Sequence, residues 1–127
     1  MGRPRNFDQE TVLDHAAGLF ASSGYAGTSI DDIVTTAGLN RGSLYATFGS
    51  KRGLFRAAML RAVSQQSMQA GDLVVVALLE LAPQDPEIRR DCKEAYSALF
   101  AADPALLGTH LLIHAGLNAD PNGKEPQ

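Results

Sequence analysis

Two short helical patterns on either side of a three-residue turn are the feature that most restricts the fold of this chain. Between residues 30 and 48, apolar side chains recur at helical spacing before and after Ala37-Gly38-Leu39. A glycine permits a sharp turn between two helices, and Leu39 can pack inward and fix the angle between them. The segment therefore predicts a helix-turn-helix motif.

Helical patterns also lie on both sides of this motif. Asp8 is expected to cap a helix that Gly24 ends, and Ser50 is expected to cap the helix after the motif. Residues 73–81 are nearly all apolar, and their three valines favour a strand by propensity. A buried helix is expected there because the sequence offers no second strand as a partner. Further helices are expected to begin at Thr28 or Ser29, at Asn40, at Asp85-Pro86 and at Asp103-Pro104.

The second helix of the motif has the composition that a major groove requires. A helix that enters the groove needs small or polar side chains on its exposed face and few carboxylates. The free N–H groups at its N-terminus also favour contact with phosphate. The candidate residues, none of them acidic, are Asn40, Arg41, Gly42, Ser43, Tyr45, Ala46 and Thr47.

Charge is divided unevenly along the chain. The formal net charge of -3 argues against a nucleic-acid partner when the chain is taken whole. Residues 1–61, however, hold seven basic and five acidic groups, a net of +2, whereas residues 62–127 hold four basic and nine acidic groups, a net of -5. This asymmetry suits a DNA-facing head and a body that stays away from phosphates.

These patterns predict an all-α fold, with an N-terminal three-helix helix-turn-helix head and a shortened helical dimerisation and effector domain. The expected divisions are a DNA-binding domain over residues 1–50, a helical regulatory and dimerisation domain over residues 51–117, and a tail over residues 118–127. The tail holds almost no apolar residues and is expected to be disordered.

Between about residues 11 and 60 the sequence resembles the TetR family of bacterial helix-turn-helix transcriptional regulators. The most specific part is the run Gly-Ser-Leu-Tyr-Ala-Thr-Phe-Gly-Ser-Lys at residues 42–51. Matching positions before it include Gly24-Tyr25, Thr28-Ser29 and Ala37-Gly38-Leu39. About 66 residues follow the head, fewer than most members of the family have, so either the ligand domain is reduced or the sequence is cut short.

The resemblance implies roles for residues of the head. The third helix of such proteins reads base edges, which here implies Arg41, Gly42 and Ser43, with Asn40 and Thr47 as additions. Phosphate contacts are implied for Thr28, Tyr45 and Lys51. Arg3 and Arg5 could form an arm that reaches a minor groove, or they could be a frayed terminus without specific contacts.

The resemblance also implies partners. Family members bind near-palindromic double-stranded DNA as homodimers, usually repress, and in many cases release DNA when a small molecule binds the C-terminal domain. The expected effector, apolar or amphipathic, would contact Cys92, Tyr96 and His110. The residues expected at the dimer interface are Leu107, Leu111 and His114.

Other classes of function are weaker fits. His110 and His114 have a spacing that could hold a metal, but no third ligand is evident, so histidines of a core or interface are favoured and no metal or cofactor is expected. Cys92 lies on an apolar stripe and is expected to be a small buried residue. No enzyme is expected, because no nucleophile elbow or phosphate loop is present.

One alternative remains open at this point. The chain could be a shortened relative that pairs with a full-length regulator and titrates it without binding DNA productively, and the DNA affinity of the pure homodimer would separate the two functions. A cytoplasmic location is expected, since no signal peptide is evident and the longest apolar stretch, residues 73–79, is far shorter than the ~20 residues that span a bilayer.

Overall fold

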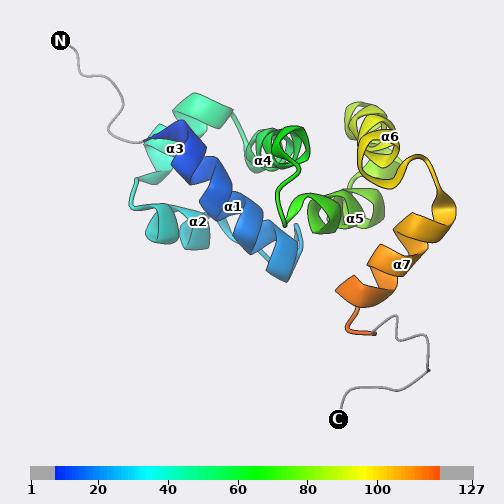
Figure 1. Ribbon diagram of the computed structural model, residues 1–127. Helices are drawn as coiled ribbons and strands as arrows, with labels where there is room; N and C mark the ends of the chain where they lie inside the picture. Colours follow the sequence, from blue (N-terminus) through cyan, green and yellow to red (C-terminus); the bar gives the residue numbers. More distant parts are fainter. Residues whose placement is uncertain (1–7, 118–127) are drawn as a thin grey trace.

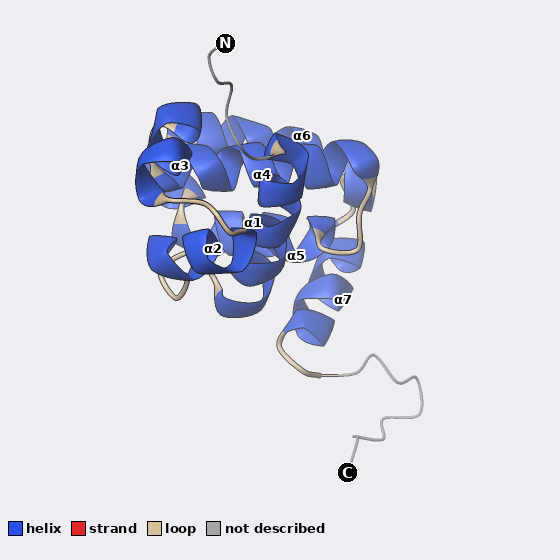
Figure 2. Cartoon of the chain, turned by 90° about the vertical axis from the view of Figure 1, so that its left-hand side faces the viewer, coloured by secondary structure: helices blue, strands red, loops and turns tan. Residues whose placement is uncertain are grey.

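The computed structural model describes residues 8–117, and this part of the chain is entirely helical, as the sequence predicts (Figures 1 and 2). It holds seven α-helices and one 3-10 turn, η1. Their bounds are α1 Gln9–Ser23, α2 Ile30–Ala37, α3 Arg41–Phe48, α4 Lys51–Gln65, α5 Ala70–Glu80, η1 Ala82–Gln84, α6 Pro86–Phe100 and α7 Pro104–His114. The predicted arm at Arg3 and Arg5 and the predicted tail over residues 118–127 lie outside the described residues.

The first four helices begin where their caps were predicted. The side chains of Asp8, Ser29, Asn40 and Ser50 each accept a hydrogen bond from a backbone N–H in the first turn of the helix that follows. Gly38 takes a left-handed conformation, with φ of 74°, between α2 and α3. Because each of these signals acts over a few residues, the helix-turn-helix could be predicted closely from the sequence.

Helix α4 joins the head to the body through a shared core. Its buried side chains pack against α1 on one side and against α5 and α6 on the other. Phe55, fully buried, meets the rings of Phe20 and Tyr25 edge-on, at centroid distances of 5.0 and 5.6 Å. One continuous core therefore runs through both parts, and the division at residue 50 stays a prediction.

Helix α5 is the most buried helix of the body. It lies among α1, α4, α6 and α7, and its residues from Leu73 to Ala77 are all buried. Because α5 is in contact on several sides, its side chains are apolar all round. The prediction of a helix rather than a strand over this segment is confirmed.

Helix α7 is attached more loosely. In Figure 1 it projects away from the head, beside α5 and the end of α6, and none of its residues is buried. Leu106, Leu112 and Ile113 are about half exposed. Within residues 8–117 no single helix is long and apolar enough to cross a membrane. Helices α6 and α7 taken together, with a bend of 95° between them, meet the criteria of length and composition only.

Candidate nucleic-acid interface

Helix α3 is anchored by one side and presents the other to solvent. Leu44 is fully buried, and Phe48 and Leu39 pack at the edge of the core. The opposite side exposes Arg41 and Gly42 in the first turn, then Tyr45 and Ala46 one turn later. The sequence therefore leaves an outer face of small, cationic and phenolic groups, of a kind that fits a groove of nucleic acid.

Gly42 is not required by the fold. Its backbone is helical, and an added Cβ would meet only the Oδ1 atom of Asn40, at an ordinary distance of 3.4 Å. Glycine inside a helix costs roughly 0.5–1 kcal/mol relative to alanine. A cost without a structural reason, on an exposed face, is consistent with close approach by a partner at this position.

The other predicted base-reading residues flank this face. Asn40 is exposed, and its Oδ1 accepts the Ser43 N–H at 2.7 Å, so the amide nitrogen is the part of its side chain left for a partner. Ser43 and Thr47 are half-buried beside the outer face. The five predicted residues thus lie together on or next to one side of α3.

Arg41 is held by an acidic residue of the preceding helix. Its guanidinium forms an ion pair with Asp31 of α2, and both side chains are largely exposed. The hydrogen bond and charge of Asp31 raise the pKa of Arg41. A phosphate or base edge would compete with Asp31 for this side chain.

Tyr45 lies on the outer face of α3, and Lys51 is in the first turn of the next helix. Tyr45 is 36% exposed. Lys51 opens α4, and its Nζ lies 4.4 Å from the ring centroid of Tyr25, a cation–π contact that leaves its N–H donors available. Both side chains carry donor groups of the kind that bind phosphate.

The predicted phosphate contact by Thr28 is wrong for its side chain. Thr28 is only 2% exposed, and its hydroxyl lies 2.7 Å from the carbonyl of Gly24 and 3.1 Å from that of Leu19, to which it donates. Ser29 caps α2 in its place, and the first turn of α2 carries Asp31 and Asp32. Two carboxylates there disfavour phosphate.

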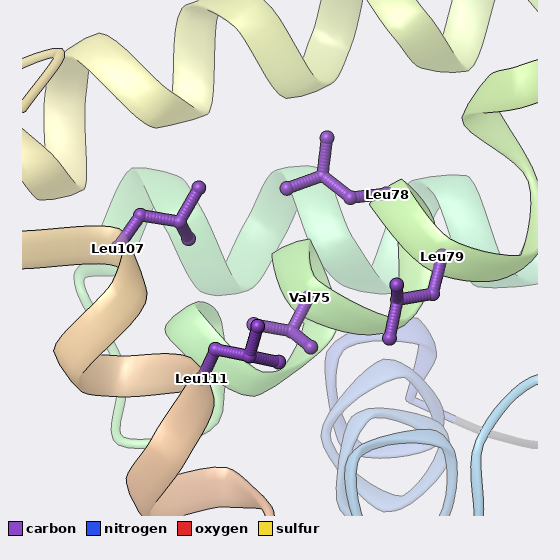
Figure 3. Close-up of a pocket in the computed structure, with 5 residues that line it drawn as sticks. All are labelled: Val75, Leu78, Leu79, Leu107 and Leu111. Atoms are coloured by element: carbon purple, nitrogen blue, oxygen red, sulfur yellow. The ribbon is translucent and has the colours of Figure 1, made fainter. Parts of the chain in front are cut away.

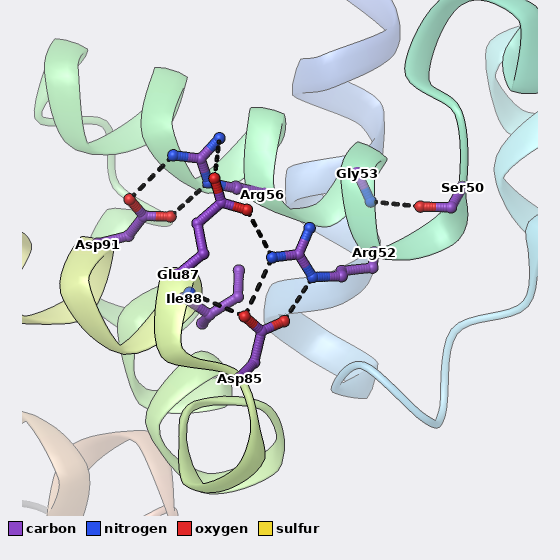
Figure 4. A network of polar contacts seen from close by, with 8 residues as sticks. All are labelled: Ser50, Arg52, Gly53, Arg56, Asp85, Glu87, Ile88 and Asp91. Carbon is purple, nitrogen blue, oxygen red and sulfur yellow. Dashed lines mark hydrogen bonds and ion pairs between the residues drawn. The ribbon is translucent and has the colours of Figure 1, made fainter.

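An ion-pair network between α4 and α6 takes up much of the basic charge counted over residues 1–61 (Figure 4). Arg52 binds Asp85 and Glu87, while Arg56 binds Asp91 and approaches Glu87. Arg52 and the Ile88 N–H hold the pKa of the Asp85 carboxyl well below its usual range. The charge count from sequence therefore overstated the DNA-facing charge, because these arginines face the body.

Arg61 is also engaged within the molecule. It binds Asp14 at 3.0 Å and approaches Glu10 at 3.7 Å, both on α1. Among the arginines and lysines between positions 8 and 61, Arg41 lies on the outer face of α3, and Lys51 contacts the ring of Tyr25.

The body contains two adjoining hollows among α5, α6 and α7, which together are called the groove. One hollow, lined by Val75, Leu78, Leu79, Leu107 and Leu111, is shown in Figure 3. A larger hollow of about 320 Å³ shares Leu78 and Leu107 and is also lined by Arg89, Cys92, Lys93 and Tyr96. Cys92 is buried as predicted, and burial together with the charge of Asp91 raises the pKa of its thiol to about 11. Cys92 is thus a buried part of the wall.

His110 is not among the residues that line this hollow, contrary to its predicted place beside Cys92 and Tyr96. Its Nε2 lies 2.8 Å from Oδ1 of Asp72, and its ring covers Gly71 so closely that a Cβ there would clash. Asp72, which sequence reasoning missed, also bonds His114 at 3.0 Å. In the described part of the chain, no group of histidines, cysteines and carboxylates has an arrangement that could hold a metal.

Residues 12–58 match the model of the family described as bacterial regulatory proteins, tetR family. Along 126 residues the chain is 32% identical to the HTH-type transcriptional regulator YezE of Bacillus subtilis (strain 168). Residues 12–58 thus carry the helix-turn-helix segment of the TetR family.

Two further comparisons cover different shares of the chain. The chain is 44% identical over 64 residues to the HTH-type transcriptional repressor ComR of Escherichia coli (strain K12). The aligned segment covers 50% of this chain and 30% of ComR. It also shares its fold with a solved structure, a cysteine mutant of the TetR family transcriptional regulator CifR complexed with 26 bp double-strand operator DNA. The TM-score is 0.50 at 27% identity, covering 94% of this chain and 78% of that one.

The match to YezE covers 98% of this chain and 61% of YezE. The chain therefore spans less than two thirds of the length of these curated relatives, and the family model matches the segment that contains the helix-turn-helix.

Proposed function

We propose that this chain is a TetR-family transcriptional repressor that binds a near-palindromic operator as a homodimer, with α3 in the major groove. The observation that carries the proposal is the outer face of α3, where Arg41, Gly42 and Tyr45 are exposed and the helix holds no acidic residue. The operator DNA in the solved relative supports the same partner.

Within this proposal, Arg41 reads a base edge, with Asn40, Ser43 and Thr47 beside it, and Gly42 lets the helix approach closely. Tyr45 and Lys51 bind phosphates on the two sides of the groove and fix the position of α3 without reading sequence. The N-terminus of α2 has no such role, because Thr28 faces inward and Asp31 and Asp32 occupy the first turn.

Lys51→Ala tests the phosphate contacts. A dimer that makes roughly 6–10 phosphate contacts loses affinity steeply with salt, with a slope of about -0.9 in log affinity per contact. The variant should reduce that slope by about 0.9 per subunit and weaken binding to all sequences alike. Duplexes first selected from a random pool with the wild-type protein serve as the probe, titrated by fluorescence anisotropy at several salt concentrations.

Lys93→Ala, which removes an exposed lysine from α6, is the matched control and should leave the slope unchanged. Wild-type protein that forms a homodimer but selects no duplex would refute the proposal and support the alternative, a protein that titrates a full-length regulator.

The homodimer is proposed to form on the exposed apolar side of α7. Leu111 is 39% exposed, and Leu112 and Ile113 are more exposed still, so several apolar groups on one short helix face water in the single chain. Leu107, predicted at the interface, packs against the core of its own chain, and His114 bonds Asp72 of α5, so both can only contribute at its edge. Twofold symmetry would place two copies of α3 about one DNA turn apart, roughly 34–36 Å.

Leu111→Glu should separate the dimer, because it places a charge in the apolar contact, and operator binding should be lost with it. Sedimentation at micromolar concentration gives the oligomeric state, and anisotropy gives the binding. Ser64→Glu, which adds a charge at an exposed site on α4, is the control. A wild-type chain that sediments as a monomer while binding DNA would contradict the dimer proposal.

The groove among α5, α6 and α7 is the proposed effector site. Apolar walls with Arg89 and Lys93 beside them suit a small apolar or amphipathic molecule. Binding there would lower the affinity for the operator, and a screen of metabolites for thermal stabilisation would identify the ligand.

A further inference from the structure

We propose that Glu80 is a positioning residue through which the body of the protein sets the place of the helix-turn-helix for DNA binding. This inference rests on the proposed function. Glu80 ends α5, whereas the segment it binds lies more than fifty residues earlier in the chain, just before α2.

The carboxylate of Glu80 accepts two backbone hydrogen bonds from the loop between α1 and α2. The Tyr25 N–H donates to Oε2 at 3.0 Å, and the Ala26 N–H donates to Oε1 at 2.9 Å. Both oxygens are therefore used, and hydrogen bonds to an ionised carboxylate are stronger than neutral ones.

The loop is built to receive this carboxylate. Gly24 has a φ of 80°, a backbone conformation that residues other than glycine rarely adopt. A Cβ at this position would come within 2.7 Å of Oε2 of Glu80. Any side chain at residue 24 would thus displace the carboxylate.

The same loop is fixed from its other side by the core. The hydroxyl of Thr28 faces the carbonyls of Gly24 and Leu19, and the Tyr25 ring stacks on Phe20 with a centroid distance of 5.8 Å. Glu80 supplies the contact from the body. Because the loop leads directly into Ile30, the first residue of α2, its position sets where α2 and then α3 begin.

The Glu80 carboxylate with its two hydrogen bonds to the loop is called the clamp, and it lies next to the groove. Leu78 and Leu79, which line the groove, directly precede Glu80 in the last turn of α5. A molecule in the groove would thus press on the turn that carries the clamp, which gives the proposed effector a route to the head.

Two possible effects of Glu80 on DNA affinity have opposite signs. A carboxylate that acted only by its charge would repel phosphates, so its neutralisation would tighten binding to DNA. If Glu80 is a positioning residue, its removal must instead weaken specific binding to DNA, because the helix-turn-helix then has to become ordered during binding.

The test compares Glu80→Gln and Glu80→Ala with Glu94→Gln, which neutralises an exposed carboxylate on α6. Amide hydrogen exchange by NMR on the full chain without DNA should show the Tyr25 and Ala26 amides exchanging about tenfold faster or more in Glu80→Ala. Glu80→Gln, which keeps the shape and one acceptor oxygen, should leave one of the two amides protected. Amides in α4 should be unchanged, which shows that the variants are folded.

Binding to the selected duplex should weaken about threefold in Glu80→Gln and about tenfold in Glu80→Ala, with no change in Glu94→Gln. Unchanged exchange at Tyr25 and Ala26 would overturn the clamp. Released amides with equal or tighter DNA binding would overturn the positioning role. Failure of the wild type to bind any duplex would instead refute the proposed function, while the exchange measurement would still decide whether the clamp exists.

Discussion

Phe55→Ala is expected to destabilise the folded chain by about 3–5 kcal/mol, the usual range for removing a fully buried phenylalanine. Phe55 is 0% exposed and packs edge-on against the rings of Phe20 and Tyr25. Its loss would leave a cavity at the place where α1, α4 and the loop before α2 meet. The rigid neighbours cannot fill that space without moving the helices.

Urea denaturation followed by circular dichroism would measure this effect. The wild-type chain should unfold in one transition, because one core runs through head and body. Leu60→Ala, on the same helix but 38% exposed, should cost about 1 kcal/mol or less and is the control. A loss below about 1 kcal/mol in Phe55→Ala, or separate transitions for the two parts, would contradict the shared core.

Arg41→Ala is expected to cost on the order of 1–3 kcal/mol at the selected operator, with little effect on random DNA. The reason is geometric: Arg41 opens the outer face of α3, next to the glycine that allows close approach. Binding constants for the selected duplex and for a scrambled one, measured at one salt concentration, would give both effects.

Asp31→Asn tests whether Arg41 reads a base or only holds α2 against α3. Asp31 holds the guanidinium of Arg41 in the free protein, so removing its charge should leave the operator affinity equal or higher. Arg90→Ala, at an exposed position on α6, is the charge control for Arg41→Ala. Equal losses on both duplexes in Arg41→Ala would assign Arg41 to a phosphate, and a matching loss in Asp31→Asn would assign it to holding α2 against α3.

The helices could be predicted from the sequence because their signals are local. Ser50 accepts the Gly53 N–H, and Asp85 accepts the Ile88 N–H, each three residues away, so the residue types and spacing alone mark the helix starts. Gly38 marks the turn for the same reason.

The contacts between elements could not be predicted in this way. Helical periodicity tells which side of a helix is apolar, but not which other helix that side will meet. Glu80 binds a loop 54 and 55 residues away, and Asp72 binds His110 38 residues away. The same limit explains why Arg52 and Arg56 were counted with the DNA-facing charge, although they face α6.

Thr28 illustrates a different limit. Threonine before a helix is a good cap by residue type, but Ser29 is the cap in the structure, and Thr28 turns inward to donate to backbone carbonyls. Adjacent residues with similar capping propensity cannot be separated without knowledge of which one the core covers.

The most direct test of sequence-specific DNA binding by α3 is the ratio of two affinities of the wild-type protein, for the selected duplex and for a scrambled duplex of equal length. At physiological salt the selected duplex should bind about 10³-fold more tightly or better. Equal affinity for the two duplexes would contradict sequence-specific recognition by this chain.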